Sequence, residues 1–311
     1  MIPEAKLLLA IVGGILALAS VLGAILRRTV KSEDGQKVVE NLVARVNAWW
    51  MMCVVFGSAL FIGQTATIVM FGITSFLALR EFITLTPTRR GDHRALFWSF
   101  FVITPLHYWA LASHWYGLFV ILIPVYAFLF IPIRTAWSGD TERFLERTSK
   151  VQWGLMVAVY FASHAPALLM LKIPGFEGRG ALLLFFLVFV VQISDVFQYT
   201  WGKLCGRRKI APLVSPSKTV EGFVCGGLSA CAAGAGLWWI TPFTPLQAAG
   251  MAGVIVLMGF FGGLVMSAVK RDRGVKDYGE LIPGHGGIFD RIDSLCFAAP
   301  VFFHLTRWWF C

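Results

Sequence analysis

The sequence predicts an all-α protein that crosses a membrane many times, with about ten transmembrane helices. Hydrophobic residues make up 57% of the 311 residues, charged residues only 14%, and the mean hydropathy is +0.72. A soluble domain carries about a quarter charged residues. Several apolar runs reach the roughly 20 residues that a helix needs to cross a bilayer. Lipid exposure also requires backbone polar groups to be paired within the segment, as they are in a helix.

Ten apolar segments follow one another along the chain. They cover about residues 6–26, 48–63, 65–83, 96–112, 115–133, 151–171, 181–200, 223–240, 246–269 and 295–310. The first is too long for a signal peptide, and Arg27 and Arg28 follow it rather than precede it, so we expect a membrane helix there. The second and third segments form one run from Ala48 to Ile83, which a tight turn near Gly63 is expected to divide.

The distribution of Lys and Arg orients these helices. If ten helices alternate in direction, five loops on one side hold all but four of the 27 Lys and Arg residues. The four on the other side are Lys6, Lys172, Arg179 and Arg307. Because cytoplasmic loops are enriched in Lys and Arg, the basic side is predicted to be cytoplasmic and both termini to face away from it. The net charge of +10 then indicates a surface beside anionic lipid headgroups, not a nucleic-acid surface.

Two polar stretches carry the chemistry of the chain. The six cysteines show no Cys-x-x-Cys spacing, so they suggest neither zinc nor a disulfide framework. The later stretch reads Ser-x-x-Lys-Arg, Lys-Asp, His-Gly-Gly and Asp-Arg-x-Asp, at Ser267, Lys270, Arg271, Lys276, Asp277, His285, Gly286, Gly287, Asp290, Arg291 and Asp293. The earlier one holds Asp195, Tyr199, Gly202, Gly206, Ser215, Pro216, Lys218, Thr219, Glu221 and Gly222. One predicted helical hairpin separates the two stretches, so both emerge on the same side.

Together the two stretches resemble the phosphatidate cytidylyltransferases, or CDP-diacylglycerol synthases, in detail over about residues 190–295. The resemblance implies transfer of CMP from CTP to phosphatidic acid with release of pyrophosphate, supported by Mg²⁺. It also implies a homodimer in the cell membrane, with its active site on the cytoplasmic face. We therefore divide the chain into N-terminal transmembrane helices, residues 1–180, and a catalytic membrane region, residues 181–311. The cytoplasmic loops of that region are residues 200–222 and 270–294.

Cytidylyl transfer depends on positioning phosphates and neutralising their charge, usually with Mg²⁺ and Lys or Arg. Mg²⁺ prefers one or two carboxylates together with phosphate oxygens and water. Through the resemblance, the predicted metal ligands are Asp290 first, then Asp277, Asp293 and Asp195. The predicted catalytic residues are Lys270, Arg271, Lys276, Asp277, His285, Asp290 and Arg291. The predicted substrate-binding residues are Ser215, Lys218, Thr219, Ser267, Gly286 and Gly287.

The sequence departs from the family pattern directly before Ser267. The family reads Gly-Asp-Leu-x-Glu-Ser, and its aspartate helps to hold a pair of metals, whereas this chain has Gly263 and Met266 at the two acidic positions. Asp195 or Asp277 could compensate, one Mg²⁺ could suffice, or the activity could be weakened or altered. Two alternative functions therefore stay open. One is a CTP-dependent transferase that acts on another lipid phosphate or a lipid alcohol, and the other is a non-catalytic membrane paralogue.

Overall fold

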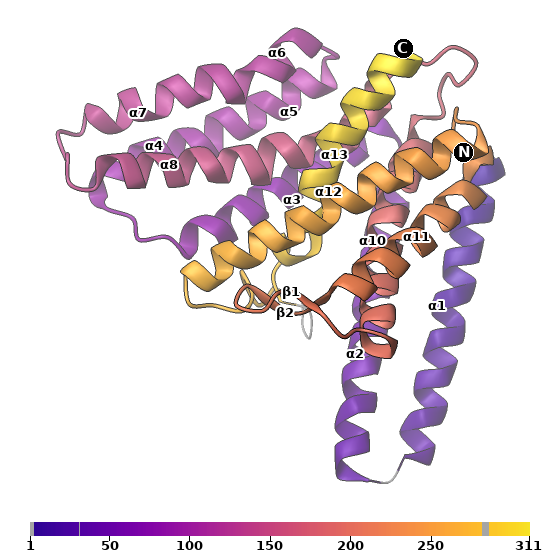
Figure 1. Cartoon of the computed structure of the whole chain (residues 1–311). Helices are drawn as coiled ribbons and strands as arrows, with labels where there is room; N and C mark the ends of the chain where they lie inside the picture. Colours follow the sequence, from indigo (N-terminus) through magenta and orange to yellow (C-terminus); the bar gives the residue numbers. More distant parts are fainter. Residues whose placement is uncertain (1–2, 31, 282–285) are drawn as a thin grey trace.

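The computed structural model describes residues 3–30, 32–281 and 286–311 of the chain. Its helices and its single described hairpin of strands are shown in Figure 1. The helices are α1 (Pro3–Thr29), α2 (Glu33–Ile62), α3 (Gln64–Thr84), α4 (His93–Trp98), α5 (Thr104–Ala112), α6 (Tyr116–Ile121), α7 (Phe128–Ala136), α8 (Phe144–Gly154), α9 (Ala162–Ala167), α10 (Gly180–Leu204), α11 (Val220–Gly236), α12 (Pro245–Asp272) and α13 (Phe289–Phe310). The strands are β1 (Lys209–Ala211) and β2 (Ser215–Thr219), which pair antiparallel.

The prediction of an all-α polytopic membrane protein is confirmed. Each of the ten predicted apolar segments is helical, and π-helical turns make continuous helices of α4 with α5, α6 with α7, and α8 with α9. Eight helical segments of the described chain are long and apolar enough to cross a membrane. The other two of the ten predicted segments are α11, a shorter apolar helix, and α13, which has 22 residues and three charged residues near its start.

The predicted turn at Gly63 is confirmed. Gly63 has a φ of 129°, a conformation that side chains other than that of glycine rarely adopt, and it separates the end of α2 from the start of α3. The start of α2 differs from the prediction, because the helix begins at Glu33 rather than near Ala48. Its first half is polar and charged, so apolar composition alone does not reveal it.

Figure 1 shows both chain termini at one end of the helix bundle. The hairpin of β1 and β2 and the last turns of α12 lie at the other end, as the predicted alternation of helices requires. The α1–α2 hairpin extends away from the other helices, and α4 to α8 form a group on the opposite side. Between them lie α3, α10, α12 and α13, whose ends carry the two polar stretches.

A close crossing of α10 and α11 brings the earlier polar stretch toward the centre of the bundle. A Cβ atom at Gly226 would lie only 2.5 Å from the backbone nitrogen of Gln198 and 2.6 Å from its Cα, so only glycine permits this approach. Small residues commonly allow such close helix packing in membranes. The crossing places the start of α11, and β2 before it, beside the last turns of α10, which hold Asp195.

Candidate active site

The two polar stretches meet at the end of the bundle, as the sequence predicts. At the start of α11, the Thr219 hydroxyl oxygen accepts a hydrogen bond from the backbone nitrogen of Gly222 (3.1 Å) and caps the helix. From the end of α12, Arg271 Nε donates to the backbone oxygen of Val214, at 3.4 Å. The strand hairpin therefore lies against the end of α12, where the later motif begins, although α11 and most of α12 come between the two in sequence.

Asp290, in the first turn of α13, is held by three donors from its surroundings. Its Oδ1 accepts a hydrogen bond from Lys270 Nζ at 2.7 Å. Its Oδ2 accepts from the backbone nitrogens of Tyr278 at 2.7 Å and Gly287 at 3.0 Å. A carboxylate offers about four lone-pair positions, and the Asp290 side chain is only 3% exposed. In this structure Asp290 therefore joins α12, the connection after it and α13, and its role as a metal ligand stays a prediction.

Tyr278 fixes the connection between α12 and α13 to the end of α12. Its hydroxyl donates to the backbone oxygen of Met266 at 3.0 Å, and its ring packs on Phe289 with centroids 4.8 Å apart. The side chain is 2% exposed, and burial raises the pKa of the phenol, which therefore stays a protonated donor at neutral pH. Lys270 Nζ lies 5.3 Å from the Tyr278 ring, so the ion pair with Asp290 is covered by an aromatic face.

Glu81, on α3, holds the start of α13 from the N-terminal part of the chain. Its Oε1 accepts a hydrogen bond from the backbone nitrogen of Ile288 (3.0 Å), and its Oε2 accepts from Phe289 (2.8 Å). The first amide groups of a helix lack internal partners, and the helix dipole favours an anion there. Glu81 is 5% exposed and was not among the predicted site residues. Its position inside an apolar segment is the signal that could have identified it.

Four charged side chains form a second group, which we call the polar recess: Asp195 on α10, Lys218 on β2, and Arg291 and Asp293 on α13. Asp195 is exposed, and the other three are partly buried. Burial lowers the pKa of Lys218, and the nearby carboxylates of Asp195 and Asp293 oppose that shift. Arg291 Nε is buried without a hydrogen-bond partner in the described part of the chain. Among the described residues, no oppositely charged group lies within 4.0 Å of any of the four side chains.

The other predicted site residues take varied positions. Ser267 donates its hydroxyl to the backbone oxygen of Gly263 within α12, at 2.6 Å. Ser215 is buried at the start of β2, whereas Lys276 and Asp277 are exposed. Gly286 has a φ of 81°, and a Cβ atom there would lie 3.2 Å from the Cβ of Asp277 and 3.0 Å from Asp290 Oδ2. The predicted residue His285 lies outside the described residues.

Residues 43–309 match the model of the cytidylyltransferase family. The chain belongs to this family. It is 39% identical to the uncharacterized protein YnbB of Escherichia coli (strain K12), over 96% of this chain and 97% of that protein. It is 38% identical to the phosphatidate cytidylyltransferase of Staphylococcus aureus (strain COL), over 40% of this chain and 48% of that enzyme. It is 41% identical to the phosphatidate cytidylyltransferase of Mycobacterium leprae (strain TN), over 45% of this chain and 44% of that enzyme.

The resemblance predicted from the two motifs is thereby confirmed, and the chain is a nucleotidyltransferase of the CTP-dependent class. The matches to these two named enzymes span less than half of each enzyme's length. The match to YnbB spans nearly all of both chains. The identity of the lipid that accepts the cytidylyl group is therefore inferred from the candidate site.

The polar recess offers this cytidylyltransferase the donors that suit Mg²⁺. No group of three or more His, Cys, Asp or Glu side chains converges on one point within the described residues. Two carboxylates suffice for Mg²⁺, which keeps several waters and takes further oxygens from phosphates. Asp195 has the Ser294 hydroxyl as a hydrogen-bond partner, and Asp293 accepts one short backbone contact from Ser294 (2.6 Å). A carboxylate offers about four lone-pair positions, so both acids keep some for a ligand. In contrast with Asp290, these two acids fit a metal that arrives with a phosphate ligand.

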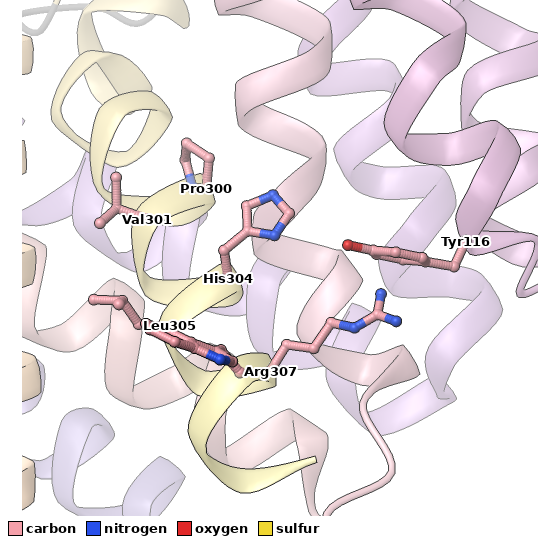
Figure 2. A pocket seen from close by; sticks show the side chains of 7 residues that line it. Tyr116, Pro300, Val301, His304, Leu305 and Arg307 are labelled. Carbon is pink, nitrogen blue, oxygen red and sulfur yellow. The ribbon is translucent and has the colours of Figure 1, made fainter.

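A hollow lies at the other end of α13, and none of the predicted site residues line it. It is lined by Tyr116, Pro300, Val301, His304, Leu305, Arg307 and Trp308. Figure 2 shows the Arg307 side chain extending beneath the Tyr116 ring, and its guanidinium carbon is 3.2 Å from the ring centroid. Trp308 and Trp309 are exposed beside it, as in the aromatic belts of membrane interfaces.

Proposed function

We propose that this cytidylyltransferase is a phosphatidate cytidylyltransferase, which converts CTP and phosphatidic acid into CDP-diacylglycerol and pyrophosphate. The observation that carries the proposal is the polar recess, where Asp195, Lys218, Arg291 and Asp293 come near one another from three separate elements and form no ion pair among the described residues. Unpaired charges at partly buried positions are costly unless a ligand compensates them. A recess with two cations and two acids suits a ligand that carries both phosphate and metal.

In the proposed reaction, a phosphate oxygen of phosphatidic acid attacks the α-phosphorus of CTP. The bond from that phosphorus to the oxygen bridging to the β-phosphate breaks, and pyrophosphate leaves. The attacking phosphate is already an anion at neutral pH, so the chain need not supply a general base. Lys218 and Arg291 would bind phosphate oxygens, and the fork of Arg291 could do so through two hydrogen bonds. Asp195 and Asp293 would hold Mg²⁺, which supplies charge neutralisation when bound.

We further propose that the protein lies in the cell membrane as a homodimer, with the recess at the cytoplasmic face. Most of the Lys and Arg residues belong to the loops predicted on that side, which also contain the strand hairpin and the end of α12. Anionic phosphatidic acid would be concentrated near such a basic surface.

The test is pyrophosphate release by the purified full chain in detergent, given CTP, Mg²⁺ and phosphatidic acid. We expect release only when both substrates are present, together with formation of CDP-diacylglycerol. Asp195→Asn should lower turnover at least about a hundredfold, as loss of a group that stabilises transition-state charge does. Asp34→Asn, at an exposed position on α2, is the matched control and should retain full turnover.

Asp290→Asn should also abolish turnover, but it removes the anchor of the α12–α13 connection as well. Its unfolding midpoint must therefore be measured alongside turnover. Offering isoprenoid phosphates and lipid alcohols in competition with phosphatidic acid identifies the acceptor. No pyrophosphate release from folded wild-type protein with any of these acceptors would refute the proposal and support a non-catalytic role.

A further inference from the structure

Gly263 on α12 leaves room for a charged group inside the polar recess. A Cβ atom built on Gly263 would lie 3.0 Å from Lys218 Nζ and 3.3 Å from Ser294 Oγ. Gly263 is buried, and these are the two atoms within 4 Å of the added Cβ. A side chain at residue 263 would therefore have to push the ammonium of Lys218 aside.

The ammonium is held there by more than the charges of the recess. Lys218 Nζ donates to the backbone oxygen of Phe260 at 3.2 Å and lies 4.5 Å from the centroid of the Phe260 ring. An ammonium over an aromatic face gains electrostatic energy, especially when partly desolvated. The ring of Phe223 packs against the ring of Phe260, with the two centroids 4.3 Å apart. Of the three donors of the ammonium, one meets the carbonyl, which leaves two for the recess.

The recess holds cationic side chains of its own. Lys218 and Arg291 lie near the acids Asp195 and Asp293, and Lys270, from the end of α12, is close enough to act on both Lys218 and Asp293. A divalent ion beside Gly263 would have to compete with the ammonium of Lys218 for the same space.

We propose that the ammonium of Lys218 is a resident cation of the polar recess and takes the place of a second divalent ion. The protein then binds no divalent cation tightly until nucleotide arrives. The inference rests on the same recess as the proposed function, but it does not depend on the lipid acceptor or on turnover. It also assigns Gly263 a role, because the small residue creates the space for the ammonium.

The test is equilibrium binding of Mn²⁺ to the purified full chain without nucleotide, followed by the electron paramagnetic resonance signal of free Mn²⁺. Wild-type protein should bind no Mn²⁺ tightly. Lys218→Met removes the resident cation, so the variant should bind one Mn²⁺ per chain at least tenfold more tightly than wild type. Lys218→Arg keeps the charge and should behave as wild type does. Lys37→Met, at an exposed position on α2, is the control for loss of a charge elsewhere.

Two results would overturn the inference: wild-type protein that binds one or more Mn²⁺ tightly without nucleotide, or Lys218→Met that folds normally and binds Mn²⁺ no more tightly than wild type. If Lys218→Met does not fold, Gly263→Asp decides the question, because the new carboxylate displaces the ammonium and should create tight binding of one Mn²⁺. Unchanged binding in Gly263→Asp then refutes the inference. Since turnover is not measured, a protein that fails to transfer CMP can still confirm or refute the resident cation.

Discussion

The contact between Glu81 and α13 predicts that Glu81→Ala lowers the stability of the protein. The carboxylate bridges α3 to a helix that starts 208 residues later in the chain, through the backbone nitrogens of Ile288 and Phe289. Alanine removes both acceptors and the negative charge at the helix start. The same turn carries Asp290, so its loss is expected to loosen the anchor of the later motif as well.

The size of the effect follows from the two hydrogen bonds. A hydrogen bond to a charged group contributes about 1.5–3 kcal/mol to the free energy of unfolding. Phe289 is buried and cannot reach water, whereas Ile288 is only partly buried and can regain a water partner. We therefore expect the free energy of unfolding to fall by about 3 kcal/mol, at the low end of two full losses. Glu81→Gln retains one acceptor oxygen and should lose about half of that amount.

The assay is reversible unfolding in mixed micelles by increasing the fraction of SDS, combined with amide hydrogen exchange. Exchange should accelerate over residues 286–292 in Glu81→Ala while the amides in the middle of α12 keep their protection. Glu40→Ala, at an exposed position on α2, is the matched control and should leave both measurements unchanged. The reasoning is refuted if Glu81→Ala unfolds within about 0.5 kcal/mol of wild type with unchanged exchange.

Three other substitutions test the packing that positions the site. Asp92→Ala removes the 2.9 Å partner of the buried Arg147, which keeps Asp140 at 3.0 Å, and should lower the free energy of unfolding by about 1.5–3 kcal/mol, measured by the same SDS titration. Lys270→Met leaves the carboxylate of Asp290 buried and uncompensated, and thermal unfolding should show a loss of similar size, about 3–5 kcal/mol. Gly226→Leu forces α11 away from α10, and overpacking of about 1–3 kcal/mol or more should reduce the folded fraction recovered by size-exclusion chromatography.

Each of these substitutions has a control in the same chain. Asp34→Ala and Lys37→Met break an exposed ion pair with 3.8 Å between its atoms and should change stability by less than about 1 kcal/mol. Gly236→Ala, on the same helix as Gly226, adds a methyl group where nothing lies within 4 Å. A substitution and its control with equal effects would show that burial and close approach do not determine stability at these positions.

The fold could be predicted from the sequence to the extent that lipid exposure imposes long apolar helices. The boundaries were less accurate where helices leave the apolar zone. The start of α2 at Glu33 and the start of α13 at Phe289 lie in polar or charged sequence, and neither belongs to an apolar run. Alternation of helices was enough to predict that the two polar stretches meet, because a hairpin of helices returns the chain to the same side.

The partners within the site could not be predicted in the same way. The contact of Glu81 with α13 spans more than 200 residues, and no local sequence pattern predicts it. Motif spacing places Asp290 and Asp293 on neighbouring turns of α13 but does not reveal which acid meets internal donors. That difference depends on the connection after α12, whose backbone nitrogens turn toward Asp290, whereas Asp293 accepts from the backbone of its own neighbour Ser294.

The difference between these two acids explains why a membrane enzyme of this family would keep so many charges at one end of its bundle. A buried charge with three short hydrogen bonds, such as Asp290, stabilises the arrangement of helices but has little left to offer a ligand. The charges of the polar recess come from α10, β2 and α13, and among the described residues they form no ion pair with one another. Such separation is costly in the free protein, and under the proposed function a metal-bearing phosphate would relieve it. The anchored group thereby maintains the geometry in which the unpaired group is ready for its ligand.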